Sequence, residues 1–187
     1  MVTELRIYFE GDARLKPGFR RFFGEIEQVA TTRRCRLNWI ATNGTPVDDY
    51  HSGLKANPNA WNVLLLDSDT PADRAFAEMC RTKGLESSHA GSVFWMVQIM
   101  ESWFLADLAA LRTYFCDRFP EAAAKGNPKV EEIPKADVMS RLENAAGGKY
   151  HKVRDGGKLL ALIDSEKVRR AAPNCDRMFS AILKALA

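Results

Sequence analysis

The sequence lacks several features that mark particular classes of protein. No hydrophobic run approaches the ~18 apolar residues that a membrane-spanning helix needs, and the first residues show no secretory pattern. The four cysteines are scattered, without the spacing of a metal site or a redox motif, and no internal repeat is present. We therefore expect a cytoplasmic protein with reduced thiols, which does not depend on disulfides for its stability.

The composition is that of a folded domain. The chain has 187 residues, of which 46% are hydrophobic and 27% are charged, so it can bury a proper core. Its net charge of +3 is too small either to demand or to exclude a nucleic-acid partner. We expect a single domain over 1–187, with an α/β core at 1–116 and a mostly helical C-terminal extension at 117–187 that carries a basic loop at 147–157.

Short apolar runs alternate with helical patterns along the first part of the chain. The runs at 5–9, 37–42, 63–66 and 93–100 read as strands. Apolar residues at helical spacing follow them, and this alternation predicts a mainly parallel four-stranded sheet flanked by helices. Helices are predicted from Pro17 onward and at 47–54, 72–80, 104–115, 135–145, 158–163, 164–171 and 176–187.

The stretch at 63–71 has the strongest functional signal. Four aliphatic residues lead directly into Asp67 and Asp69, and Pro71 ends the strand. The carboxyl end of a parallel strand is the edge where ligands bind in open α/β sheets. Two neighbouring carboxylates repel each other unless a proton or a cation compensates them, and Mg²⁺ prefers carboxylate oxygen. The pair therefore predicts a cation site.

Two other predicted strands also end in an acid. Glu10 follows the first strand and Glu101 follows the fourth. Parallel strands lie ~5 Å apart, so acids at their carboxyl ends can share one or two ions. We predict a site for Mg²⁺ or Mn²⁺ formed by Glu10, Asp67, Asp69 and Glu101. The alternative is that each acid caps the helix that follows its strand.

Basic residues supply candidates for phosphate binding. Lys152 and Arg154 lie in the predicted loop at 147–157 and Lys158 follows it, so these cations could neutralise phosphate, or the loop could simply be solvated. A second basic group surrounds the start of the first helix and could receive a DNA or RNA backbone, or be an ordinary solvated helix face. It consists of Arg14, Lys16, Arg20 and Arg21.

Several other polar and aromatic residues are expected to lie outside the predicted site. Asp107 is expected to pair with a base or to cap a helix, and His151 is a lone loop histidine. His89 precedes the fourth strand and so lies at the opposite edge of the sheet from the acids. Trp95 and Trp103 are expected in the core.

The acidic motifs resemble a known domain. Glu10-Gly11 after the first strand and Asp67-Ser68-Asp69 after a later strand resemble the Toprim domain of topoisomerases, DnaG-type primases and overcoming-lysogenization-defect (OLD) nucleases. The resemblance implies that these acids bind Mg²⁺ and that Glu10 also acts in proton transfer. Many sequences of this group carry a further small residue before the next acid, whereas Asp12 follows Gly11 directly, which leaves a metal role for Asp12 open.

A longer resemblance covers most of the chain. Met96 to Asp107 resembles the hallmark of the bacterial "domain of unknown function 4276" family, which is placed among Toprim-like proteins. The segments at 130–135, 150–152, 158–160 and 173–179 also resemble it. The resemblance implies a Toprim-like fold, and it implies an association with ATPases in gene clusters for phage defence.

Taken together, these features predict a Mg²⁺-dependent phosphodiesterase that acts on DNA or RNA, with an ATPase as a possible protein partner. Glu10, Asp67, Asp69 and Glu101 would hold the ions, and Lys152 would neutralise the phosphate.

Two other functions stay open. Asp67-Ser68-Asp69-Thr70 also fits the Asp-x-Asp-x-Thr motif of haloacid-dehalogenase-type phosphatases, in which Asp67 would be the nucleophile. That motif normally lies on the first strand of its domain, and the later Asp pair of those enzymes is missing here. The third hypothesis is a non-catalytic protein that binds a metal or a nucleotide as the partner of an ATPase.

Overall fold

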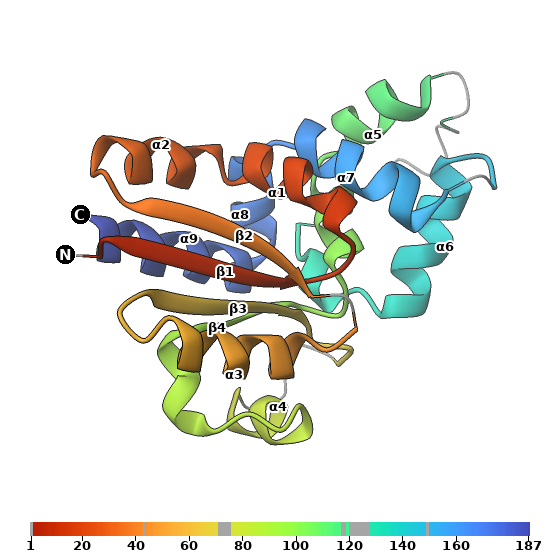
Figure 1. Ribbon diagram of the computed structural model, residues 1–187. Coiled ribbons are helices and arrows are strands. Elements are labelled where there is room, and N and C mark those ends of the chain that lie inside the picture. Colours follow the sequence, from red (N-terminus) through yellow and green to blue (C-terminus); the bar gives the residue numbers. More distant parts are fainter. Residues whose placement is uncertain (1, 43, 71–75, 117–118, 120–127, 149) are drawn as a thin grey trace.

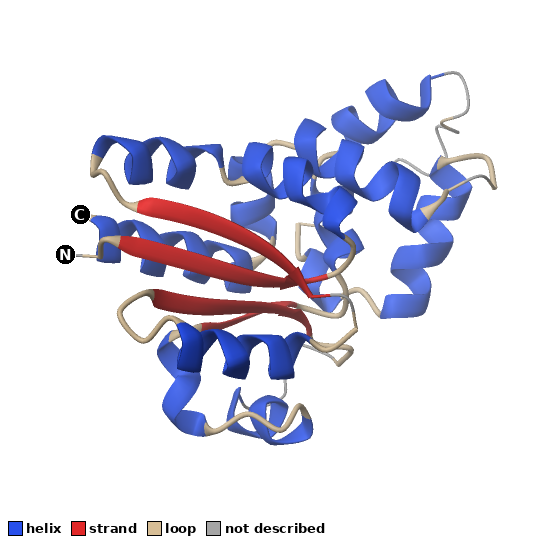
Figure 2. Ribbon diagram, viewed as in Figure 1, coloured by secondary structure: helices blue, strands red, loops and turns tan. Residues whose placement is uncertain are grey.

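A parallel four-stranded sheet forms the centre of the molecule. The computed structural model describes residues 2–42, 44–70, 76–116, 119, 128–148 and 150–187. The strands run in the order β2-β1-β3-β4, and every neighbouring pair is parallel (Figures 1 and 2). The predicted α/β class is thus confirmed. The strands are β1 (Glu4–Glu10), β2 (Arg36–Thr42), β3 (Trp61–Asp67) and β4 (Val93–Met96).

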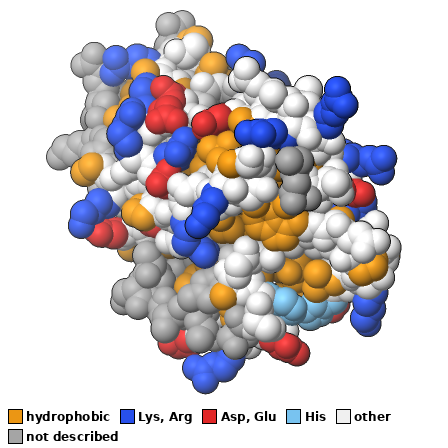
Figure 3. All heavy atoms as spheres, turned by 90° about the vertical axis from the view of Figure 1, so that its left-hand side faces the viewer, with side chains coloured by type: hydrophobic (Ala, Val, Ile, Leu, Met, Phe, Trp, Pro, Cys, Tyr) orange, Lys and Arg blue, Asp and Glu red, His pale blue; other side chains and the backbone are white. Residues whose placement is uncertain are grey.

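The register of the sheet aligns the carboxyl ends of the strands. Glu10 at the end of β1 pairs with Thr42 at the end of β2, and Asp67 at the end of β3 pairs with Met96 at the end of β4. Side chains at these positions therefore meet along one edge, at the right of the sheet in Figure 1. The opposite edge, near both chain termini, shows hydrophobic groups among charges of both signs (Figure 3).

Helices cover both faces of the sheet. The larger core lies on the face covered by α1 (Lys16–Phe22), α2 (Gly24–Thr32) and α9 (Pro173–Leu186), where aromatic rings from β1, β2 and these helices pack together. A smaller core lies under α3 (Pro46–Ala56) and α4 (Phe76–Thr82). Because side chains alternate along a strand, Phe9 enters the first core and Tyr8 the second.

Apart from η2, which packs beside α4 on the second face, the other helical segments gather beyond the carboxyl edge and on the first face. Among them, α6 has the bounds that the sequence predicts, and α7 packs against α1 (Figure 1). No helix of the described ranges is both long and apolar enough to cross a membrane. These segments are η1 (Ala13–Leu15), η2 (Ser87–Gly91), η3 (Met100–Ala106), α5 (Leu108–Phe115), η6 (Val130–Glu132), α6 (Lys135–Ala145), α7 (Lys152–Leu162) and α8 (Ser165–Ala171).

The fourth strand is shorter than the apolar run at 93–100 predicts. β4 ends at Met96, and Gln98 adopts the left-handed region with a φ of 63°. The hydroxyl of Ser68 accepts a hydrogen bond from the amide of Gln98 at 2.8 Å, which fixes this turn. Glu101 therefore lies on η3 and not at a strand end. The predicted helix at 72–80 begins outside the described residues, and α4 covers its second half.

The predicted loop at 147–157 is also wrong in its second half. In the structure the loop ends at His151, and α7 begins at Lys152. The imidazole of His151 accepts a hydrogen bond from the amide of Arg154. Asp155 completes the cap because its carboxylate accepts from the amide of His151 at 2.8 Å. Gly156 and Gly157, which the prediction took as loop residues, lie inside the helix at close contacts with η1 and α1.

Candidate functional site

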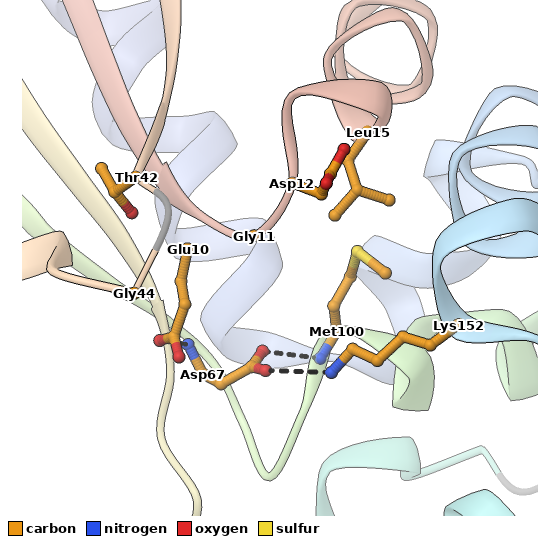
Figure 4. Close-up of a pocket in the computed structure, with 9 residues that line it drawn as sticks. All are labelled: Glu10, Gly11, Asp12, Leu15, Thr42, Gly44, Asp67, Met100 and Lys152. Atoms are coloured by element: carbon orange, nitrogen blue, oxygen red, sulfur yellow. Dashed lines mark hydrogen bonds and ion pairs between the residues drawn. The ribbon is translucent and has the colours of Figure 1, made fainter.

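A pocket of about 290 Å³ opens at the carboxyl edge of the sheet (Figure 4). Its acids come from β1, from the turn before η1 and from β3, and its base comes from the first turn of α7. The pocket thus lies where the sequence predicts a site. The lining residues are Glu10, Gly11, Asp12, Leu15, Thr42, Gly44, Asp67, Met100 and Lys152.

Glu10 and Asp67 lie on neighbouring strands and are joined through the backbone. The amide of Asp67 donates a hydrogen bond to Oε2 of Glu10 at 3.1 Å. Oδ1 of Asp67 in turn accepts from the amide of Met100 at 2.8 Å, at the start of η3. These bonds orient the two carboxylates toward the pocket, where Figure 4 shows the Asp67 side chain directed at Met100 and Lys152.

Glu101 is the most deeply buried acid of the site. Its side chain has an exposed fraction of 0%, and it reaches the site from η3. Its Oε1 accepts a hydrogen bond from the hydroxyl of Tyr150 at 3.3 Å. Its Oε2 is buried and has no hydrogen-bond partner among the residues that the structure describes. A buried charged oxygen without a partner is costly, so this atom is available to a cation or a proton.

Lys152 provides positive charge to two of these acids at once. Its Nζ lies 3.5 Å from Oε1 of Glu101 and 3.9 Å from Oδ2 of Asp67. Both distances are long for a direct hydrogen bond, and the side chain is 52% exposed. The ammonium therefore compensates the pair only in part, and it can turn outward toward a bound anion.

Burial and the excess of negative charge raise the pKa values of two groups in the site. Burial raises the pKa of Asp67 to about 8, and repulsion from Glu101 and then from Glu10 adds to the shift, while Lys152 opposes it. Burial also raises the pKa of Tyr150, together with the neighbouring charge of Glu101. Tyr150 hence remains a hydrogen-bond donor, and Asp67 holds a proton near neutral pH unless a cation replaces it.

Asp69 does not join the other three acids. Its amide donates to the carbonyl of Gln98, and its φ of 53° lies in the left-handed region. The carboxylate instead contacts Nζ of Lys135 at 2.7 Å and Nζ of Lys83 at 2.9 Å. Partial burial opposes ionisation of Asp69, but the bonds from Lys135 and Lys83 outweigh it and lower the pKa.

The donor set of the pocket fits a hard divalent cation. The structure brings together Glu10, Asp67 and Glu101, which offer only oxygen atoms, and one of these atoms has no partner. Within the described part of the chain, no three His, Cys, Asp or Glu side chains already form a cluster that could hold a metal. A bound ion would therefore require a rearrangement of the side chains around Lys152. The role of Glu10, Asp67, Asp69 and Glu101 as ligands stays a prediction.

Most other candidates have structural partners. Asp12 binds the guanidinium of Arg14 at 2.8 and 2.9 Å, which lowers the pKa of its exposed carboxyl to about 2. Asp107 caps α5 and contacts Lys167 at 2.7 Å, as the sequence suggests. The remaining pairs are Arg20 with Glu27 and Arg154 with Asp155.

Sequence reasoning missed three side chains of this region. Tyr150 falls within the segment at 150–152 that resembles the family, and its position two residues before Lys152 is the signal that could have identified it. Lys83 and Lys135 lie far from Asp69 along the chain, and nothing in their local sequence indicates that they bind it.

Comparisons with known proteins agree with this fold. The model of the family described as a domain of unknown function (DUF4276) matches residues 12–183. No curated protein sequence matches the chain. Among solved structures, the C-terminal region of the Burkholderia pseudomallei OLD protein is similar, with a TM-score of 0.58 and 15% sequence identity over 100% of both chains. The fold therefore resembles that region, and the chain belongs to the DUF4276 family.

Proposed function

We propose that the protein is a Mg²⁺- or Mn²⁺-dependent phosphodiesterase that cleaves DNA or RNA. The observation that carries the proposal is the group of Glu10, Asp67 and Glu101 at the carboxyl edge, with Oε2 of Glu101 buried and unpartnered. The resemblance of the acidic motifs to Toprim domains supports the same chemistry, and so does the similarity of the fold to an OLD C-terminal region.

The residues of the pocket have distinct roles in this proposal. A divalent ion bound by the carboxylates would activate water and stabilise the charge that develops on the phosphate. Asp67 would give up its proton to hold the ion, and the backbone amide of Met100 keeps its carboxylate in place. Lys152, which lies near Asp67 and Glu101 in the absence of an ion, would direct its ammonium to a phosphate oxygen.

Glu101 and Glu10 complete the arrangement. Tyr150 orients Glu101 by donating to Oε1, which leaves Oε2 directed to the ion or to a water molecule. Glu10 is only partly buried, whereas Asp67 is buried, and it is the candidate for proton transfer. Asp69 would become a ligand only by leaving Lys83 and Lys135.

The test is cleavage of plasmid DNA, single-stranded DNA and RNA with Mg²⁺ or Mn²⁺. Asp67→Ala and Asp67→Asn should both abolish cleavage, because they remove the central carboxylate. Asp137→Asn is the matched control, since this exposed acid of α6 lies outside the pocket. Cleavage that persists undiminished in the Asp67 variants would refute the assignment.

The same material distinguishes the other two hypotheses. In a phosphatase with Asp67 as nucleophile, a phosphoaspartate analogue could be trapped at Asp67. In a phosphodiesterase it could not. A protein that binds metal without turnover would be inert on every nucleic acid and would co-purify with an ATPase. The position of Asp67 on β3 disfavours the first of these, because the Asp-x-Asp-x-Thr motif normally lies on the first strand of its domain.

A further inference from the structure

A second cavity lies beside the acidic pocket, between η1–α1 and α7. Its volume is about 490 Å³, and most of its lining is apolar. We call it the α1/α7 groove. Its floor consists of Pro17, Gly18, Val153, Gly157 and Ala161, and its rim consists of Arg14, Arg154 and Lys158.

Gly18 of α1 and Gly157 of α7 allow the two helices that form the groove to approach closely. A methyl group at Gly18 would collide with the carbonyl oxygen of Gly157, and one at Gly157 would lie 2.8 Å from the carbonyl oxygen of Arg14. The two backbones are therefore in direct contact. The groove is a preformed feature, since neither helix can approach further or be shifted without strain.

The rim carries cations in fixed positions. Arg14 and Arg154 each bind one carboxylate through two nitrogen atoms, those of Asp12 and Asp155, and both guanidinium groups stay more than half exposed. Lys158 lies one turn after Arg154 on the same side of α7, and it is exposed. Within the described residues it makes no ion pair, so its charge is available to a phosphate.

The groove lies close to the acidic pocket along the chain, although no residue lines both. Arg14 lies two residues after Asp12, and Arg154 lies two residues after Lys152, and both Asp12 and Lys152 line the pocket. Along α7, the six residues from Lys152 to Lys158 correspond to about 9 Å. Since positions six apart also lie about 120° apart around a helix, a strand with regularly spaced negative charges would have to bend around the start of α7 to contact both lysines.

We propose that the α1/α7 groove binds single-stranded nucleic acid next to the phosphate that enters the acidic pocket. This inference rests on the proposed function and adds that the site prefers a single strand to a duplex. Phosphates match the cations of the rim, and an apolar floor matches the exposed face of an unstacked base or sugar. In a duplex the base faces are stacked inside, so the floor would have nothing to contact.

The test measures binding without cleavage. Fluorescence anisotropy in EDTA would compare a labelled single-stranded 20-mer with the matching blunt duplex. Lys158→Glu should weaken binding of the single strand by about tenfold and reduce the salt dependence by about one ion, because one phosphate contact is lost. Lys158→Arg should restore it. Lys184→Glu on α9 makes the same charge change outside the groove and should alter the affinity by less than about twofold.

A 20-mer without bases tests whether the apolar floor of the groove contacts the bases. It keeps the phosphates and should bind at least about threefold more weakly than the normal strand. Wild-type affinity in Lys158→Glu, equal affinity for duplex and single strand, or no binding at all would each overturn the inference. Because binding is measured in EDTA, loss of binding in Lys158→Glu would stand even if Asp67 proved irrelevant to cleavage, so the two proposals fail separately.

Discussion

Asp67 and Glu101 share a single ammonium group. Nζ of Lys152 lies 3.9 Å from Oδ2 of Asp67 and 3.5 Å from Oε1 of Glu101, and both acids are buried. One cation cannot compensate two carboxylates, so the site is stable at neutral pH only with a proton on Asp67 or with additional positive charge.

The free energy of unfolding should therefore depend on the protonation of Asp67. Its pKa is about 8 in the folded protein and close to 3.8 in the unfolded chain. Between these values the unfolded chain releases the proton and the folded protein retains it, so stability falls as the pH rises. Asp67→Asn cannot ionise, and we expect it to be clearly more stable than the wild type at pH 8, by several kcal/mol (on the order of 1.4 kcal/mol per unit of pKa shift), and almost equally stable at pH 4.

Urea denaturation of both proteins at pH 4 and pH 8, without divalent ions, measures this difference. Asp137→Asn serves as the control, since the residue is exposed and should leave the pH dependence unchanged. The explanation fails if wild type and Asp67→Asn lose stability in parallel as the pH rises.

Binding of a divalent ion should release a proton from the same residue. Below pH 8 the ion must displace the proton of Asp67, so the affinity for Mn²⁺ should increase about tenfold for each pH unit between 6 and 8. Calorimetry in two buffers with different ionisation enthalpies counts the released proton. A pH-independent affinity would show that the ion does not use Asp67.

The sequence predicts the sheet and its acidic edge well, because both depend on local patterns. Apolar runs mark the strands, and the parallel arrangement then places Glu10 beside Asp67 without further information. Glu101 lies near the same acids, but it reaches them from η3 and not from the predicted end of the fourth strand. The apolar run gives no sign that Gln98 turns the chain, because that turn depends on the hydroxyl of Ser68.

The partners of Asp69 could not be predicted for a different reason. Lys83 and Lys135 contact it at 2.9 and 2.7 Å from separate helical regions, and only the tertiary fold brings them together. Similarly, two consecutive glycines at 156–157 suggest a loop when read locally. They lie within α7 because α1 and η1 approach so closely that no side chain fits between them.

Tyr150 should act on the site through Glu101. Tyr150→Phe removes the donor to Oε1 and leaves a fully buried carboxylate with Lys152 alone, so we expect Mn²⁺ affinity to fall about tenfold. Tyr114→Phe is a matched control, because its hydroxyl also binds a buried carboxylate, that of Asp155, outside the pocket. Equal losses of affinity in both variants would indicate a general effect on folding and not a role at the site.

Asp69 should contribute less to metal binding than Asp67. Its carboxylate is already bound by Lys83 and Lys135, so Asp69→Asn should weaken Mn²⁺ binding by less than about threefold, whereas Asp67→Asn should weaken it by at least about a hundredfold. Because both ion pairs are partly exposed, their loss should cost no more than about 1 kcal/mol of stability. Calorimetric titration of the two variants with Mn²⁺ decides the matter, and similar losses would mean that Asp69 leaves the lysines to bind the ion.

The contact between α1 and α7 should control the position of Lys152. Gly18→Ala places a methyl group against the carbonyl oxygen of Gly157, a backbone atom that cannot move by a rotamer change. We expect a loss of about 2 kcal/mol of stability, because overpacking forces the helices apart. Since Lys152 is the first residue of α7, cleavage should fall as well.

Gly24→Ala provides the comparison for this variant. Gly24 also lies in a helix, and a methyl group there meets no atom within 4 Å. It should therefore leave both the melting temperature and the rate of cleavage near those of the wild type, or raise stability slightly through the better helix propensity of alanine. If Gly18→Ala retains wild-type stability and cleavage, the packing of α1 on α7 does not hold Lys152 in place. Loss of cleavage without loss of stability would instead show that a small shift of α7 alone disables the site.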